Sequence, residues 1–273
     1  MAYVRDKFWI FGVRAHQDDI WLKPPPGIKV PYKFRSRITP SEAAFMLHAR
    51  NVLMINCEGE PAPYGEDAYG YMESFCRMNK VLWGGTGSDG FRAGNEEEFI
   101  CDLCEKYPNI AGEYLDDFAG RYRKYPDKVE RAMAFLKEIR SKLDKAPKPM
   151  ELYTTWYWDE EPFPGMEEYI DAFVFFCHHI DEINALKDNF EKIEKLYPNK
   201  KKLLGIYMYS FHDRRPTPVE LMEKQCNLAL ELLREGRLDG LIFEANSVMG
   251  VGLESEMWLR DWVEKVQDIE VPD

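Results

Sequence analysis

The sequence predicts an α/β protein that folds as a single (β/α)8 barrel, also called a TIM barrel, over residues 1–273. Two observations support this prediction. Short segments rich in β-branched and aromatic residues recur eight times along the chain, and helical patterns separate most of them. Strands that alternate with helices form parallel sheets, and eight such units match the length of one closed barrel. No change in composition indicates a second domain.

The predicted strands are short and apolar. Residues 172–177, for example, are AFVFFC, which is typical of a parallel strand covered on both faces. An open doubly wound sheet is the alternative, but no GxGxxG or GxxxxGK[ST] motif follows any strand. The glycines of residues 84–87 (GGTG) indicate instead a tight turn or a close approach at a strand end. The strands are expected at residues 8–16, 52–59, 81–88, 110–118, 151–158, 172–179, 203–211 and 238–247.

Helix-start signals lie between the predicted strands. Thr39 and Pro40 form one, because a hydroxyl before a proline suits the first turn of a helix. Residues 95–98 form another, with three acids where the helix dipole favours negative charge. The longest amphipathic stretches are residues 126–143 and 218–234.

The composition narrows the class of protein. The formal net charge of −12 argues against nucleic acid as a partner, since such proteins bind phosphates through Lys and Arg. No apolar run approaches the roughly 18 residues of a membrane span, and no signal-peptide pattern follows Met1. Six scattered cysteines are expected as reduced thiols. We therefore expect a cytoplasmic protein, or an exported one if its natural N-terminus has been trimmed, that binds neither nucleic acid nor membrane.

Alternation along the strands predicts which side chains face the barrel interior. Placing the apolar residues outward turns Glu58, Asp116 and Glu244 inward, at the C-terminal ends of three strands where barrel enzymes place their chemistry. The alternative is that every barrel mouth is polar and that one or two of these acids pair with Arg14. The residues expected outward are Trp9, Phe11, Val13, Leu53, Ile55, Cys57, Ala111, Leu115, Leu241 and Phe243; those expected inward include Arg14, His16, Asn56, Tyr114, Ile242 and Asn246.

The segment of residues 113–117 (EYLDD) supplies acids in any register. The same phase directs Glu113 toward the helices, where a carboxylate needs a partner, so this strand is either bulged or shifted in register. Asp117 begins the following loop and is close enough to reach the mouth.

Aromatic and histidine side chains are expected around the same rim. Trp156, Trp158 and Tyr209 end predicted strands, and their flat rings suit stacking on sugar faces. The alternative is that these rings fill the barrel. For Tyr207 the sequence favours neither ligand contact nor barrel filling. Trp21 lies in the long loop of residues 17–38, a candidate lid or wall over the mouth. The candidate ligand-binding residues are Arg14, His16, Asn56, Trp156, Trp158, His178, Tyr209 and Asn246.

A barrel with inward carboxylates and a rim of Trp and Tyr resembles the broad superfamily of (β/α)8 glycoside hydrolases. Residues 114–118 (YLDDF) are similar to the acidic motif that ends the fourth strand in several of its families, although the Asn-Glu pair of other families is absent. The resemblance implies a carbohydrate ligand and hydrolysis by two carboxyl groups. It favours Asp116 and Glu244 as the catalytic pair, with Glu58 or Asp117 as substitutes. We expect no cofactor and no metal.

Two other functions remain open. A metal-dependent sugar isomerase, epimerase or endonuclease-like barrel would use Glu58, Asp116, His178 and Glu244 as a metal cage, although no HxH or HExxH spacing supports it. A non-catalytic carbohydrate-binding barrel would keep the cleft without a working pair of acids.

Overall fold

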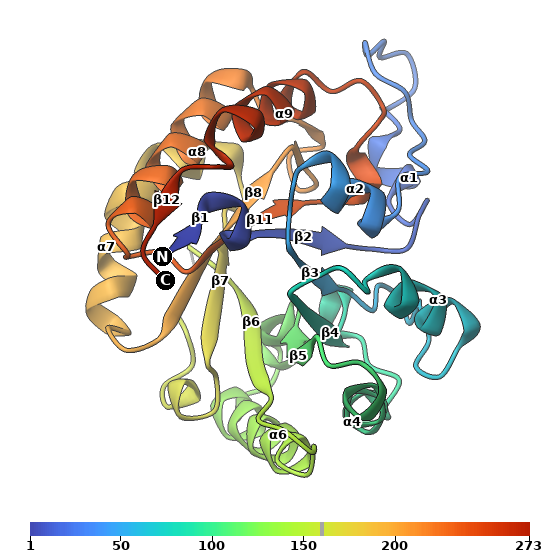
Figure 1. Ribbon diagram of the computed structural model, residues 1–273, viewed down its shortest axis with the longest axis vertical. Helices are drawn as coiled ribbons and strands as arrows, with labels where there is room; N and C mark the ends of the chain where they lie inside the picture. The colour runs from blue at the N-terminus through green and yellow to red at the C-terminus, as the bar shows by residue number, and fades with distance from the viewer. Residues whose placement is uncertain (159–160) are drawn as a thin grey trace.

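The computed structural model describes residues 1–158 and 161–273, and a closed barrel of eight parallel strands forms its centre (Figure 1). Neighbouring strands are hydrogen-bonded in the order β11-β2-β3-β4-β5-β6-β7-β8. The (β/α)8 prediction is thus confirmed. The barrel strands are β2 (Phe8–Gly12), β3 (Asn51–Met54), β4 (Lys80–Thr86), β5 (Ile110–Leu115), β6 (Glu151–Tyr157), β7 (Ala172–Phe176), β8 (Lys201–Tyr207) and β11 (Gly240–Glu244).

Helices surround the barrel (Figure 1). The predicted start at Thr39 is confirmed: its hydroxyl accepts a hydrogen bond from the Glu42 amide at 3.3 Å, and the Glu42 carboxylate accepts one from the Thr39 amide at 2.8 Å. The helices are α1 (Asp19–Leu22), α2 (Pro40–Met46), α3 (Glu66–Ser74), α4 (Glu96–Lys106), α5 (Phe118–Tyr122), α6 (Lys128–Leu143), α7 (Leu186–Leu196), α8 (Val219–Arg234) and α9 (Glu254–Val266).

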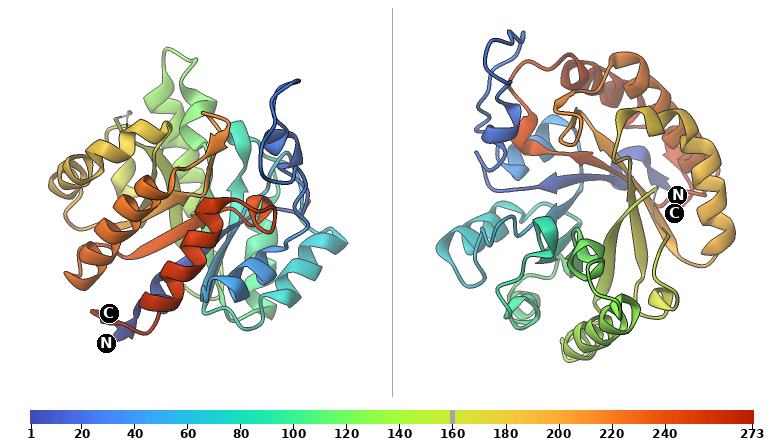
Figure 2. Two further views of the ribbon diagram at one scale, coloured as in Figure 1. Left: turned by 90° about the horizontal axis from the view of Figure 1, so that it is seen from above. Right: turned by 180° about the vertical axis from the view of Figure 1, so that it is seen from behind.

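The two chain ends meet at one end of the barrel. The short strands β1 (Ala2–Tyr3) and β12 (Glu270–Val271) pair antiparallel there. Figure 2 shows both termini at this end, whereas the loop after β2 projects from the other end. A second small hairpin, β9 (Tyr209–Ser210) with β10 (Arg215–Pro216), lies in the connection after β8. The strand predicted to reach residue 211 therefore ends at Tyr207.

The interior of the barrel corrects part of the predicted phase. Trp9, Phe11 and Leu53 belong to the apolar cluster inside the barrel, not to the helix side. Their neighbours on β2 and β3, such as Phe8 and Val52, are apolar as well and pack toward the helices. Size and polarity therefore do not distinguish the two faces of these strands. The inward residues that were predicted outward are Trp9, Phe11, Val13, Leu53, Ile55, Cys57 and Ala111, whereas Tyr114 and Ile242 lie inside as predicted.

The segment of residues 17–38 is held over the C-terminal end of the barrel. The Tyr209 hydroxyl donates to the carbonyl of Trp21 at 2.9 Å, and the Ser36 hydroxyl donates to the carbonyl of Met249 at 2.6 Å. These bonds attach the segment to the barrel mouth at Trp21 and at Ser36. Elsewhere, all six cysteines are free thiols, and among the described residues no helix is long and apolar enough to cross a membrane.

Candidate active site

A pocket of about 270 Å³ lies at the C-terminal ends of the barrel strands. Four carboxyl groups line it, and in the part of the chain that the structure describes no Lys or Arg does so. Hydroxyl-bearing and aromatic side chains complete the wall. The carboxyl groups are those of Asp18, Asp116, Asp117 and Glu244, and the other main lining residues are Trp21, Thr155, Tyr157, Tyr207 and Phe211.

Asp116 follows the last residue of β5 and is buried. The hydroxyl of Thr155, on the neighbouring strand β6, donates to its carboxylate at 2.8 Å. The Asp116 backbone is held by Thr86 at the end of β4, whose hydroxyl donates to the Asp116 carbonyl at 2.6 Å. Burial raises the pKa of Asp116 well above its usual value, and the charge of Asp117 acts in the same direction.

Glu244 is the last residue of β11 and is also buried. In the strand order of the barrel, β11 and β5 lie on opposite sides. Burial raises the pKa of Glu244 well above its usual value, the charge of Asp116 raises it further, and a hydrogen bond with Tyr207 opposes both. Glu244 therefore holds its proton more firmly than an exposed glutamate does.

Asp117 adopts a left-handed backbone conformation, with φ of 45°. The Tyr157 hydroxyl donates to its carboxylate at 2.8 Å. The Tyr157 ring stacks on the imidazole of His178, with 3.6 Å between ring centroids. The left-handed turn thus places two consecutive carboxyl groups at the end of β5.

Asp18 is a site residue that the sequence analysis missed. It lies directly before α1 in the segment of residues 17–38, and the Ser247 hydroxyl donates to its carboxylate. Burial raises the pKa of Asp18 to about 6, against the effect of that hydrogen bond. The one available signal was the Asp18-Asp19 pair directly after the first strand, since barrel sites are built from such loops.

Two predicted site residues, Arg14 and His16, follow β2, which ends at Gly12 and not at residue 16 as predicted, and they lie outside the pocket. The Arg14 guanidinium forms an ion pair with Asp67 at 2.9 Å and approaches Glu60 at 3.6 Å, away from the four acids. His16 is exposed, and its Nδ1 lies 3.2 Å from a carboxylate oxygen of Asp19. The alternative that Arg14 neutralises Glu58, Asp116 or Glu244 is wrong in this structure.

The two predicted asparagines do not line the pocket, and one of them supports the backbone instead. The Asn246 side chain accepts a hydrogen bond from the Val13 amide at 2.8 Å and donates to the Ile38 carbonyl at 2.7 Å. It therefore ties the start of the segment after β2 to the end of β11. Asn56 is buried, and its backbone lies so close to Gly87 that a Cβ there would approach the Asn56 carbonyl oxygen to 1.6 Å. The predicted close approach in the GGTG segment is confirmed.

The predicted aromatic contacts fall on the wrong face of β6. Trp156 and Trp158 pack toward the helices, where Trp156 contacts Phe163. Their neighbour Tyr157 lines the pocket in their place, because a β-strand alternates its faces. Tyr209 is buried in the outer core and positions Trp21 through its hydroxyl.

Two further cavities flank the acidic pocket. A cleft of about 1240 Å³ shares Asp18 and Trp21 with it and contains Glu58, whose carboxylate accepts a hydrogen bond from Gln17 at 3.2 Å. On the other side, a depression of about 360 Å³ is lined by Trp21, His178 and Asp117. Trp21 thus lies where all three cavities meet.

The predicted metal cage is not assembled. Asp116 and Glu244 line the acidic pocket, whereas Glu58 lies in the large cleft and His178 in the smaller depression. Within residues 1–158 and 161–273, no group of three or more His, Cys, Asp or Glu side chains is placed to hold a metal ion.

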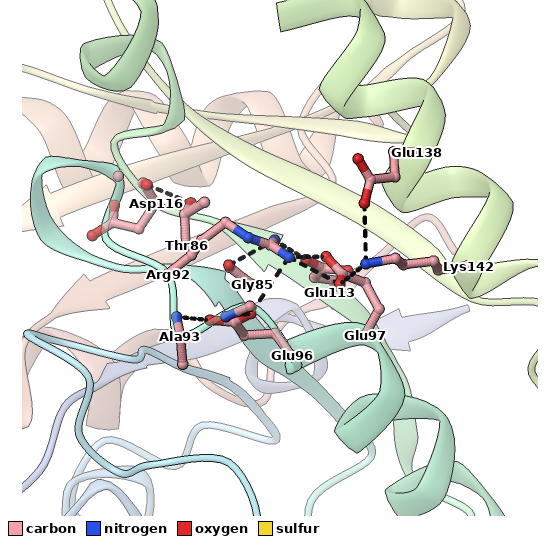
Figure 3. A network of polar contacts seen from close by, with 12 residues as sticks. Gly85, Thr86, Arg92, Ala93, Glu96, Glu97, Glu113, Asp116, Glu138 and Lys142 are labelled. Atoms are coloured by element: carbon pink, nitrogen blue, oxygen red, sulfur yellow. Dashed lines mark hydrogen bonds and ion pairs between the residues drawn. The ribbon is translucent and has the colours of Figure 1, made fainter.

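An ionic network with buried carboxylates lies on the helix side of β4 and β5 (Figure 3). Glu113 faces the helices as predicted and needs its partner there. The Arg92 guanidinium lies 3.7 Å from Glu113, 2.6 Å from Glu97 and donates to the Gly85 carbonyl at 3.0 Å. Lys142 of α6 lies 3.3 Å from Glu97. The register of β5 against β4 shifts nearby, so the strand is also irregular, as one alternative predicted.

No protein-family model matches the chain, and no curated protein matches it. Several solved structures are similar to it. A GH99 endo-alpha-mannosidase from Bacteroides thetaiotaomicron has a TM-score of 0.59 at 11% identity, over 96% of this chain and 97% of that one. A beta-glucuronidase from Bifidobacterium dentium has a TM-score of 0.57 at 11% identity, over 97% of this chain. A beta-D-glucuronidase from Dictyoglomus thermophilum has a TM-score of 0.53 at 9% identity, over 99%.

This chain spans only about half of each glucuronidase, 48% and 52% of their lengths. At identities this low, structural similarity shows a shared fold and nothing more. The chain is therefore a (β/α)8-barrel protein that shares its fold with known glycoside hydrolases.

Proposed function

We propose that this protein is a glycoside hydrolase that cleaves its substrate with Asp116 and Glu244. The observation that supports this most directly is the pocket itself: two buried carboxyl groups from opposite strands meet in a space where described residues supply no cation. Hydrolysis of a glycosidic bond requires one protonated and one ionised carboxyl group at the same pH. The fold shared with known glycosidases is consistent with this proposal but does not assign the residues.

The hydrogen bonds favour a division of roles. Asp116 accepts from the Thr155 hydroxyl and from the backbone of Asp117, and both bonds stabilise its ionised form. Glu244 has one such bond, with Tyr207, which lowers its pKa, whereas burial and the charge of Asp116 raise that pKa. Glu244 accordingly donates a proton to the leaving oxygen, and Asp116 acts on the anomeric carbon, directly or through a water molecule.

The remaining walls suit a sugar. Trp21, Tyr157 and Phe211 present rings to the pocket, and apolar ring faces stack on the C–H faces of sugars. The exposed Trp21 lies at the junction of the three cavities, so a sugar chain that occupies the flanking cavities passes this ring.

The test is hydrolysis of a broad panel of glycosides by the natural chain and by two isosteric variants. Glu244→Gln and Asp116→Asn should each lower kcat by about 10²–10⁴-fold, because each removes a group that transfers a proton or acts at the anomeric carbon. Glu60→Gln is the matched control, since Glu60 lies at the surface beside Arg14 and outside the pocket.

Two outcomes would contradict the proposal. One is hydrolysis that both variants retain at the natural rate. The other is sugar binding that both variants retain, with no hydrolysis by the natural chain on any member of the panel. The second result would establish a non-catalytic carbohydrate-binding barrel.

A further inference from the structure

The large cleft beside the acidic pocket is polarised in charge. Its inner end holds Asp18 and Glu58, next to the pocket. Its outer part is formed by the residues after β4 and β5 and by α6, and contains four cationic side chains. Local positive charge of this kind contrasts with the formal net charge of −12. The four cations are Arg92, Arg121, Lys124 and Arg131.

Two of these cations have carboxylate partners. Arg92 belongs to the buried network with Glu97, and Arg131 lies 2.7 Å from Asp127. The other two differ: Arg121 donates to the Gly90 carbonyl at 3.0 Å, and in the described part of the chain neither Arg121 nor Lys124 forms an ion pair with a carboxylate. These two side chains are exposed and available to an anion.

An acid in the outer cleft does not cancel them. Glu138 lines this part, but its carboxylate lies 3.2 Å from Lys142, toward the buried network (Figure 3).

Aromatic rings also line this part of the cleft. Tyr125 is 37% exposed and Phe91 is 42% exposed, although large apolar rings are usually buried. The Lys124 ammonium lies 5.4 Å and the Arg131 guanidinium 4.6 Å from the centre of the Tyr125 ring. Exposed aromatic surface and cations therefore lie together in this part of the cleft, where a sugar and its charged substituent would each find a partner.

The size of the cleft indicates a chain of sugars. Its volume of about 1240 Å³ exceeds the roughly 300–1,000 Å³ of sites for single small molecules. Because the acidic pocket repels anions, a negatively charged sugar would be bound better in the outer cleft than at the cleaved bond.

From these observations we propose that the cleft binds an anionic glycan, whose carboxylate or sulfate groups are bound by Arg121 and Lys124 on a sugar unit remote from the cleaved bond. The assignment of the cleaved bond rests on the proposed hydrolase function, whereas the anion-binding subsite does not depend on hydrolysis. The proposed subsite narrows the substrate class to acidic polysaccharides.

Binding to three polymers tests this subsite, with the full chain carrying Asp116→Asn so that the polymer is not cleaved. Polygalacturonate offers carboxylates, dextran sulfate offers sulfates, and dextran is the neutral reference. We expect calorimetry to detect binding of at least one polyanion, tighter than dextran and weakened by added salt. Binding of polygalacturonate and not of dextran sulfate would identify carboxylate as the bound anion. Binding of dextran sulfate and not of polygalacturonate would identify sulfate.

Charge-removing variants then locate the binding. Arg121→Gln with Lys124→Gln should weaken polyanion binding by about tenfold or more, because charge-assisted hydrogen bonds are lost. Arg121→Lys, which keeps the charge, should retain most of it. The matched control is Lys137→Gln with Lys187→Gln, which removes two exposed charges outside the cleft. Thermal unfolding checks that all variants fold.

The outcomes separate this proposal from the hydrolase function. Absence of polyanion binding, or binding that the Arg121 and Lys124 variants leave unchanged, overturns the subsite even if neutral glycans are hydrolysed. Binding that depends on these two residues supports the subsite even if no glycan is hydrolysed, and in that case the hydrolase proposal fails alone.

Discussion

Strand β5 and the residue directly after it carry two buried carboxyl groups, Glu113 and Asp116, in opposite environments. Glu113 faces the helices and lies beside the Arg92 guanidinium, with Lys142 close by (Figure 3). Asp116 faces the barrel mouth, where it meets hydroxyl groups and other acids.

Burial raises the pKa of both groups well above their usual values, so burial alone does not distinguish a functional acid from a structural one. Neighbouring carboxylates raise the pKa of both groups further, Glu97 at Glu113 and Asp117 at Asp116, so the difference lies in the cation. The Arg92 guanidinium opposes the shift at Glu113, whereas Asp116 lies next to an open pocket that no Lys or Arg of the described residues lines. The comparison predicts that changes on the helix side lower stability and that changes at the mouth alter activity.

Arg92→Met should have the largest effect on stability, because it leaves Glu97, Glu96 and Glu113 buried without their guanidinium. Breaking a buried ionic group in this way costs about 3–5 kcal/mol, measured as the loss of unfolding free energy in urea. Arg131→Met is the control, since it breaks the exposed pair with Asp127 and should cost less than about 1 kcal/mol. Equal losses for both variants would contradict the comparison.

Asp18→Asn should stabilise the protein at neutral pH. The folded-state pKa of Asp18 is about 6, raised from 3.8, so the folded protein binds this proton more tightly than the unfolded chain. The stabilisation of the folded state by this proton is fully present below about pH 4 and is lost as the pH rises through about 6. The variant should therefore gain about 1–2 kcal/mol at about pH 7.5 and almost nothing at about pH 4, measured by urea unfolding.

The opposite pH dependence, or a loss of stability at neutral pH, would show that the Ser247 hydrogen bond to Asp18 outweighs burial. Asp102→Asn is a suitable control, because Asp102 lies far from the mouth in a hydrogen bond with the exposed Tyr64.

Asp117→Asn should change the pH dependence of hydrolysis. The charge of Asp117 raises the pKa of Asp116, so its removal lowers that pKa. If Asp116 acts in its ionised form, the acidic limb of the kcat/KM profile moves to lower pH. A limb that stays in place, or moves to higher pH, would assign the ionised role to a different carboxyl group.

Arg14→Gln should have the smallest effect. Its ion pairs with Asp67 and Glu60 are half-exposed, and such pairs contribute less than about 1 kcal/mol. Unfolding free energy and kcat should both stay close to those of the natural chain. A loss of kcat comparable to that of Glu244→Gln would place Arg14 in the site after all.

Much of the fold was predictable because it depends on repeated local patterns. The alternation of apolar strands with helix-start signals, such as Thr39 before Pro40, predicted the closed barrel. The inward positions of Tyr114 and Ile242 followed from strand alternation, and so did the exit of Asp116 and Glu244 at the mouth. Glycines at residues 84–87 indicated close packing, which Glu113 and Asn56 supply.

Other features were not predictable from local patterns. Phe8 and Trp9 are both large and apolar, so nothing in β2 indicates which of them faces the helices. Trp156 and Tyr157 present the same difficulty on β6, and there the wrong neighbour was chosen. Arg14 was expected inward, but Asp67 on α3 provides its partner outside the pocket.

The sequence by itself determined the barrel and the strand ends at which acids emerge, because both follow from the period of two along each strand and from the order of elements. Only the tertiary structure decided which acids share a pocket and which other acids have a cation beside them. Asp18 and Trp21 enter the site from the segment of residues 17–38, and Arg92 reaches Glu113 through packing between β4, α4 and β5. Such contacts depend on distances between segments remote in sequence, which no local pattern specifies.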